Sequence, residues 1–383
     1  MVTLAKLEIY KLVRKQSFWL SLLIMLAFFA ETYLSWMNST EAILAKDGTL
    51  LKGLAAGRQD KEISEAYQGI MTDDVVEQIL RNERYNEAQM EELWILYNSE
   101  KSTYVSAVNR LVGYYFLRMD ITEGEVYDAW GYRYGEEELY KIGDVFPESA
   151  LPLYYEYSVP WGGTLESIIS CIFLLNVFLI IGISPIFSEE RTQNMNQLLF
   201  TSKFGRRKCF WAKAGVAYVL SSALAFGVIL LLLLITLSIY GTTGLACSIQ
   251  LVEPFLYQDY QFVRTLGAVI VDAVILSVAG IWFTVSLILL VSVLAKNALN
   301  TVVLSFVLFV APMIVRIFPL ADQVKLIAPI NRMADFSDVL CLPDMRIGEI
   351  GIPYSYVISG ILLLSSVALT VGTAVIYEKQ SDE

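Results

Sequence analysis

The sequence contains no histidine, and this absence excludes several kinds of site at once. Histidine is the usual general base near neutral pH and the commonest metal ligand in proteins. Without it, no Ser-His or Cys-His pair is available for nucleophilic catalysis. The phosphate-binding pattern G-x-x-x-x-G-K-[ST] is also missing, so we do not expect an ATPase site on this chain. The sequence therefore predicts a protein with no catalytic residues, no metal site and no cofactor of its own.

Cysteine is scarce as well, and its positions show no C-x-x-C spacing. The four residues are Cys171, Cys209, Cys247 and Cys341. Cys247 and Cys341 both fall in segments that we place outside the membrane, so a disulfide between them is an open alternative. Two isolated cysteines are a weak disulfide framework, and free thiols are the favoured interpretation.

Charged residues are few, at 17%, whereas hydrophobic residues make up 56% and the mean hydropathy is +0.53. Soluble chains contain roughly 45–50% apolar residues, and a run of about 18 uncharged residues marks a membrane span. The net charge of −11 arises largely between residues 38 and 160, where 23 residues are acidic and 11 are basic. No basic patch indicates nucleic-acid binding. The composition predicts a membrane protein with one acidic segment.

Six hydrophobic segments have the length of transmembrane helices. They are residues 17–37, 161–187, 214–240, 265–294, 300–318 and 354–377. A cleaved signal peptide is the alternative for the first segment, but its apolar run continues through Trp36, past any small-x-small cleavage site. We therefore predict an all-α polytopic membrane protein with six transmembrane helices.

The distribution of charge predicts the orientation of these helices. The short segments that we place inside hold 12 basic and 6 acidic residues; they are residues 1–16, 188–213, 295–299 and the tail 378–383. The short segments that we place outside, residues 241–264 and 319–353, hold 4 basic and 7 acidic residues. Basic residues are enriched in short cytoplasmic loops, so both termini are predicted to be cytoplasmic.

Two further segments have a recognisable character. Residues 1–16 combine four basic residues with apolar ones that include Leu4, Leu7 and Leu12, which predicts an amphipathic helix on the inner membrane surface. Residues 38–160 are predicted to form a small, mostly helical extracellular domain. Within it, Thr72 is placed to cap a helix whose first turn holds acidic residues.

The segment at residues 188–213, between the second and third spans, carries the most distinctive pattern. Ser188 is a candidate N-cap, and Glu189 and Glu190 follow it where a helix dipole favours negative charge. The spacing of three apolar residues predicts one face of a short helix; they are Met195, Leu198 and Leu199. A basic turn at the inner surface follows, formed by Arg206, Arg207, Lys208 and Lys213. An ordinary basic loop is the alternative interpretation.

This order of features resembles the coupling-helix region of ABC-2 type permeases, the membrane subunits of ATP-binding-cassette exporters. The resemblance covers residues 1–37 and 161–380. It implies that the short helix docks into a separate ABC ATPase, which binds ATP and Mg²⁺. It also implies two ATPase copies, a second permease that is identical or homologous, and a location in the plasma membrane of a bacterium. In this family, parts of the segment corresponding to residues 319–353 re-enter the membrane; here a surface helix is the alternative.

Two other functions remain open at this stage. One is a membrane-anchored sensor or resistance protein whose acidic extracellular domain is a receptor, although such a protein does not need six spans. The other is a secondary transporter, which normally shows an internal repeat, and none is visible here. The sequence does not favour any one substrate among peptides, drugs, lipids, polysaccharides and ions.

Four ionisable residues lie within the predicted spans, in the outer third of the bilayer. They are Glu31, Glu166, Asp272 and Arg316. A charge facing lipid costs about 2.5–3.5 kcal/mol at mid-membrane and less near the interface, so contact with the headgroups explains most of them. Asp272 is short and has apolar neighbours. We expect Asp272 to face the protein interior and either to pair with Arg316 or to line a hydrated vestibule.

Overall fold

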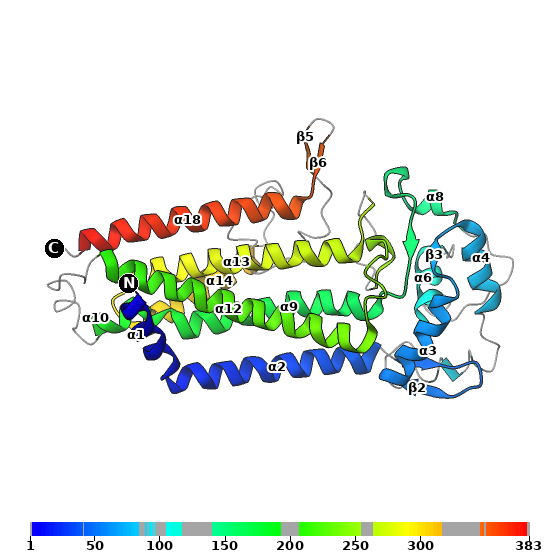
Figure 1. Cartoon of the computed structure of the whole chain (residues 1–383), viewed down its shortest axis with the longest axis horizontal. Helices are drawn as coiled ribbons and strands as arrows, with labels where there is room; N and C mark the ends of the chain where they lie inside the picture. The colour runs from blue at the N-terminus through cyan, green and yellow to red at the C-terminus, as the bar shows by residue number, and fades with distance from the viewer. Residues whose placement is uncertain are drawn as a thin grey trace.

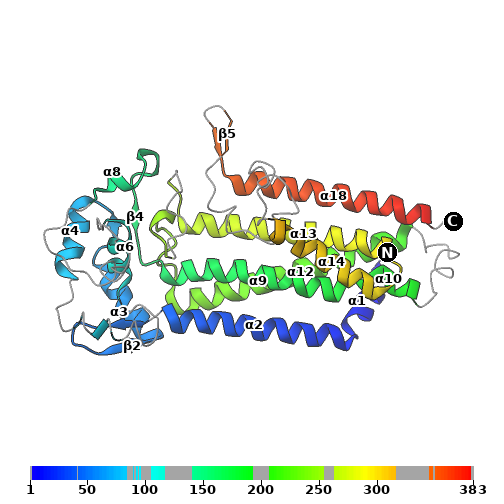
Figure 2. The same cartoon turned by 180° about the vertical axis from the view of Figure 1, so that it is seen from behind.

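The computed structural model shows a bundle of long helices with a smaller domain at one end (Figure 1). It describes residues 2–40, 42–83, 89, 92–93, 95, 105–116, 140–192, 207–253, 263–315, 345–347 and 350–380. Both chain termini lie at the same end of the bundle, which we call the terminal end, and the smaller domain lies at the other, the domain end. The two views of the molecule agree on this arrangement (Figure 2).

The bundle is built from helices that follow the predicted apolar segments. They are α2 (Gln16–Thr40), α9 (Val159–Ile183), α12 (Arg207–Tyr240), α13 (Leu266–Leu294), α14 (Ala298–Val315) and α18 (Tyr354–Gln380). In the described part of the chain, four helices are long and apolar enough to cross a membrane, the first being α9 with its continuation to Thr192. A fifth span results if α2 is joined to α1 (Val2–Val13), from which it is bent by 67°, whereas α14 is apolar but shorter.

Helix α13 lies at the centre of the bundle and contacts α9, α12, α14 and α18, while α2 packs on α9. The buried faces are apolar; Leu165, Ile172 and Leu289, for example, have no exposed surface. Many hydroxyls inside the bundle bond to a carbonyl of their own helix, and some polar groups pair across helices, which suits a setting without water. The Thr164 and Thr236 hydroxyls, for instance, are 2.6 Å apart and join α9 to α12.

Residues 42–157, between α2 and α9, form the smaller domain, which we call the inter-helix domain. Its helices are α3 (Leu54–Glu65), α4 (Asp73–Asn82), α6 (Ala107–Tyr115) and α8 (Ile142–Val145), with the 3₁₀ turn η1 (Glu148–Ala150). It also contains two short antiparallel pairs, β1 (Ala42–Leu44) with β2 (Leu50–Lys52), and β3 (Gly69–Ile70) with β4 (Tyr154–Tyr155). The predicted cap is confirmed, because the Thr72 hydroxyl accepts the Val75 N–H at 3.4 Å.

The inter-helix domain shares its hydrophobic core with the bundle. One cluster of buried side chains contains Ile79 and Leu111 of the domain together with Leu165 and Leu289 of the bundle. At the domain end, α12 and α13 are joined by residues 241–265, which we call the connection and which contain the 3₁₀ turn η2 (Ile249–Leu251). A hairpin of β5 (Met345–Ile347) and β6 (Ile350–Ile352) leads into α18.

The segment after the second predicted span differs from expectation. Helix α9 ends at Ile183, and a second helix, α10 (Pro185–Thr192), follows after one residue. Ser188 therefore lies inside α10, and its predicted role as an N-cap is wrong. The predicted basic turn also differs, because α12 already begins at Arg207 and Lys208 and Lys213 belong to that helix.

The described cysteines are free thiols. Cys171, Cys209 and Cys247 are all buried. Cys341 lies outside the described residues, as does most of the segment 319–353, parts of which were expected to re-enter the membrane. Burial raises the pKa of the Cys247 thiol to about 11, so this thiol is protonated near neutral pH.

Candidate functional site

Helix α10 projects from α9 at the terminal end and is fixed by contacts to α13. Proline has no N–H and a restricted φ, so Pro185 suits the first turn of a new helix directly after α9. The first N–H groups of a helix lack partners within it. Here the Ser292 hydroxyl of α13 accepts the N–H groups of Phe187 at 3.0 Å and Ser188 at 3.3 Å. The direction of α10 is therefore set by α13.

Lys213, in the second turn of α12, is completely buried against α10. Its Nζ lies 2.5 Å from the Glu190 Oε2 and donates to the Ile186 carbonyl at 2.8 Å. The same ammonium lies 4.9 Å from the centre of the Phe187 ring. A buried ammonium is strongly unfavourable unless it is paired and hydrogen-bonded. These contacts with α10 meet that requirement and join α10 to α12.

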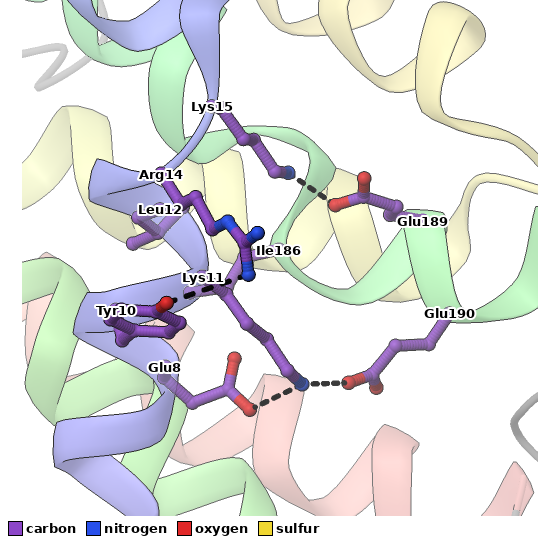
Figure 3. A pocket seen from close by; sticks show the side chains of 9 residues that line it. All are labelled: Glu8, Tyr10, Lys11, Leu12, Arg14, Lys15, Ile186, Glu189 and Glu190. Carbon is purple, nitrogen blue, oxygen red and sulfur yellow. Dashed lines mark hydrogen bonds and ion pairs between the residues drawn. The ribbon is translucent and has the colours of Figure 1, made fainter.

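Helix α1 and the turn that joins it to α2 supply two more lysines to the acidic pair of α10 (Figure 3). The Lys11 Nζ lies 3.0 Å from a Glu8 carboxylate oxygen and 3.5 Å from the Glu190 Oε1. Lys15 forms an ion pair with Glu189. A cavity of about 380 Å³ separates α1 from α10 at this place. We call these six residues the terminal cluster: Glu8, Lys11, Lys15, Glu189, Glu190 and Lys213.

Aromatic side chains extend this network to the end of α18. The Phe187 and Phe210 rings are stacked, with centroids 5.5 Å apart and planes inclined by 16°. The Tyr377 ring of α18 lies 5.2 Å from Phe187 and 5.7 Å from Phe210. Arg207 and Glu378 form an ion pair at 3.4 Å between α12 and α18. Helix α10 thus contacts α1, α12, α13, α14 and α18 at the terminal end.

The structure places the predicted coupling residues as follows. Glu189 and Glu190 are engaged by lysines of their own chain, through the terminal cluster. Lys213, predicted at the inner surface, is instead wholly buried, whereas Arg207 and Lys208 are exposed. The remaining four residues of the prediction lie outside the described part of the chain; they are Met195, Leu198, Leu199 and Arg206.

The ionisable residues predicted within the membrane differ in their surroundings. Asp272 of α13 is only 1% exposed, and its Oδ2 lies 2.8 Å from the Arg264 Nη1. The Ser355 hydroxyl of α18 donates to the same oxygen at 3.3 Å. Glu166 is half-buried on α9 and Glu31 is exposed on α2. Arg316, the partner that we predicted for Asp272, lies outside the described residues.

Several residues of the site were not predicted. Lys11 and Lys15 were used only to orient the chain, although their positive charge, opposite an acidic pair in another inner segment, was a usable signal. Ser292 and Tyr377 gave none, because serine and tyrosine at helix ends have many roles. Their part in the site depends on which helices become neighbours.

A bundle of long apolar helices with a charged cluster at one end is the architecture of a polytopic membrane protein. The family of this chain is shown by its match to the model of the ABC-2 family transporter protein over residues 2–377. The chain belongs to this family, which makes it a multi-pass membrane protein and the non-catalytic membrane component of a transporter. No curated protein and no solved structure matches the chain.

Proposed function

We propose that this chain is the transmembrane half of an ATP-driven exporter whose ATPase docks at the terminal end of the bundle. In this proposal the chain crosses the plasma membrane of a bacterium six times, with both termini in the cytoplasm and residues 38–160 outside. ABC-2 family membership supports the pairing with an ATPase. The proposal rests mainly on the ion pairs of Glu190 in α10, which bind it both to Lys11 of α1 and to Lys213 of α12.

The contacts of α10 suggest how force from the ATPase reaches the membrane helices. The segment that directly follows α10 contains Met195, Leu198 and Leu199, and these apolar residues are proposed to pack into a groove of the ATPase. A displacement of that segment moves α10. Lys213 then transmits the movement to α12, and Ser292 transmits it to α13. ATP and Mg²⁺ act on the partner, and this chain contributes the helices that move.

Removal of the proposed docking residues tests this mechanism. We expect Leu198→Ala with Leu199→Ala to abolish co-purification of the ATPase, because loss of a buried leucine side chain costs about 2–5 kcal/mol. The matched control is Leu230→Ala with Leu231→Ala, which truncates two adjacent leucines that are exposed on α12. The control is expected to retain the ATPase. Equal recovery of ATPase with both double variants would show that the docking site lies elsewhere.

The proposed assembly contains two permeases and two ATPase subunits, because one chain of this family is half of a transporter. Native mass spectrometry of the complex solubilised from its own membranes measures this directly. The expected mass is that of two 43.1 kDa permeases and two ATPase subunits. A mass that fits one permease without an ATPase would contradict the assembly.

A further inference from the structure

The connection between α12 and α13 is bonded to the inter-helix domain along much of its described length. The Ser248 N–H donates to the Tyr154 carbonyl at 2.8 Å, and the Ser248 hydroxyl accepts the Tyr154 N–H at 2.8 Å. The Tyr115 hydroxyl of α6 donates to the Gln250 carbonyl at 2.5 Å. The domain therefore does not rest on the bundle through side-chain packing alone. Part of its backbone is paired with the connection.

A buried group of charges lies at the centre of this contact. Arg110 of α6 is 3% exposed, and its Nε and Nη2 lie 2.5 Å and 2.7 Å from the two carboxylate oxygens of Glu253 in the connection. Such two-point pairing of a guanidinium with a carboxylate fixes geometry as well as charge. The Arg110 Nη2 also lies 3.8 Å from the Asp60 Oδ2, and the Asp60 Oδ1 accepts the Ala107 N–H at 2.9 Å. Arg110 thus joins α3 and α6 to the connection.

Two glycines allow the connection to approach the start of α9 closely. A Cβ atom at Gly162 would lie 2.0 Å from the Glu253 carbonyl oxygen. A Cβ atom at Gly244 would lie 2.3 Å from the Tyr157 carbonyl oxygen, and Gly244 has a φ of +101°, which other residues rarely adopt. The backbone of the connection is therefore in direct contact with the first turn of α9 and the residues before it.

The connection is also bonded to α13, and the guanidinium of its Arg264 lies 6.0 Å from the centre of the Tyr356 ring of α18. The Leu266 N–H donates to the Cys247 carbonyl at 2.8 Å, and the Gly267 N–H donates to the Leu245 carbonyl at 2.9 Å. Arg264 is ion-paired with the buried Asp272 of α13, which in turn accepts a hydrogen bond from Ser355 of α18. One short segment thus contacts the inter-helix domain and three helices of the bundle.

We propose that the connection holds the inter-helix domain and the adjacent ends of α9, α13 and α18 together as one rigid unit. The Arg110–Glu253 ion pair is the contact that contributes most to this unit. The domain then cannot change its position without displacing these helices, and the helices cannot move apart without displacing the domain. Because such coupling is reciprocal, a ligand that binds the domain better in one arrangement of the helices would favour that arrangement. This inference goes beyond the proposed ATPase docking and does not depend on it.

Hydrogen–deuterium exchange of the purified full-length chain in lipid nanodiscs tests the proposal, and no ATPase is needed. We expect Arg110→Met to increase the exchange rate at least about tenfold in residues 105–116, in residues 241–253 and in the first turns of α9 and α13. All of these segments belong to the unit that the Arg110–Glu253 ion pair stabilises. Exchange in the middle of α12 is expected to stay unchanged. The matched control is Arg81→Met, which removes the exposed Arg81–Glu77 pair of the same domain and is expected to change none of these segments.

A milder variant keeps the test decisive if Arg110→Met fails to fold. Glu253→Gln retains an oxygen that accepts one hydrogen bond from Arg110, and we expect it to raise exchange in the same segments by a smaller factor. If a folded Glu253→Gln variant exchanges at the wild-type rate throughout, the proposal is wrong. An increase confined to residues 105–116 would also overturn it, since Arg110 would then only stabilise its own helix.

Discussion

Lys213 and Glu190 form an ion pair with an Nζ–Oε2 distance of 2.5 Å, and no part of the Lys213 side chain is exposed. The two residues belong to α12 and α10, which flank the segment that we propose to dock with the ATPase. Separation of this pair would leave an ammonium buried without its charged partner. The pair therefore resists separation far more than an exposed ion pair does, and α10 and α12 are expected to move together.

Removal of Glu190 is expected to destabilise the chain strongly. Glu190→Ala leaves the Lys213 ammonium buried without a carboxylate, and loss of one partner of a buried pair costs about 3–5 kcal/mol. We expect a clear fall in the midpoint of thermal unfolding in nanodiscs. The double variant Glu190→Ala with Lys213→Met removes both charges and should recover much of the loss. A double variant that is no more stable than Glu190→Ala would indicate that the pair is not the cause.

The Lys15–Glu189 pair of the same cluster is expected to behave differently. Its side chains are 28% and 38% exposed, and ion pairs of this kind contribute roughly 0–1 kcal/mol. Lys15→Ala should therefore shift the unfolding midpoint only slightly, and the shift should disappear at an ionic strength of about 1 M because salt screens exposed charges. A large shift that persists in high salt would show that this pair, too, is effectively buried.

The long helices were predictable because each one contains a long, predominantly apolar run. The Thr72 cap was predictable for a similar reason, since a hydroxyl followed by two acidic residues is a local signal. The terminal cluster depends on information that is not local. Lys213 is near Glu190 only because α10 and the start of α12 pack side by side at the terminal end, where Ser292 of a third helix also binds α10.

The continuation of the second span as α10 illustrates a second limit. The predicted short helix begins after Ser188, whereas α10 begins at Pro185, a residue that suits the first helical position. The Asp272 pair shows the same difficulty. The burial of Asp272 was expected from its short side chain and apolar neighbours. Arg316 was the predicted partner because the directions of the spans place it at the same depth in the membrane as Asp272. Arg264, the actual partner, lies directly before the N-cap of α13 and eight residues from Asp272, outside the predicted spans in which the partner was expected.

Asp272 is expected to contribute strongly to the stability of the bundle where α13 meets α18. Asp272→Ala removes the carboxylate that pairs with Arg264 and accepts from the Ser355 hydroxyl, at a cost of about 3–5 kcal/mol for a broken buried pair. Asp272→Ala with Arg264→Ala should be milder, and thermal unfolding of the purified variants measures both. The pairing would be refuted if the double variant were the less stable of the two.

The inter-helix domain is expected to lose stability as the pH rises through about 6, because of Asp60. Burial raises the pKa of Asp60 from 3.8 to about 6, although Arg110 and the Ala107 N–H act in the opposite direction. Burial has the larger effect on this pKa because the Arg110 guanidinium is 3.8 Å from Asp60 but only 2.5 Å and 2.7 Å from the Glu253 oxygens. The Glu253 carboxylate therefore neutralises much of the positive charge that would otherwise lower the pKa of Asp60. The folded state therefore binds the Asp60 proton more tightly than the unfolded state does.

The direction in which stability changes with pH follows from this difference in proton affinity. The contribution of Asp60 to stability is fully present below about pH 4 and is lost as the pH rises through about 6, which amounts to on the order of 1 kcal/mol between pH 5 and pH 7. Asp60→Asn keeps an oxygen that accepts the Ala107 N–H but cannot ionise. Other carboxylates titrate in both proteins, so the informative quantity is the difference between them. Hydrogen exchange of residues 105–116 at pH 5 and pH 7, corrected for the intrinsic rate, should show the wild-type domain losing stability relative to Asp60→Asn. A difference that is zero, or that grows in favour of the wild type as the pH rises, would mean that Asp60 is already ionised at pH 5.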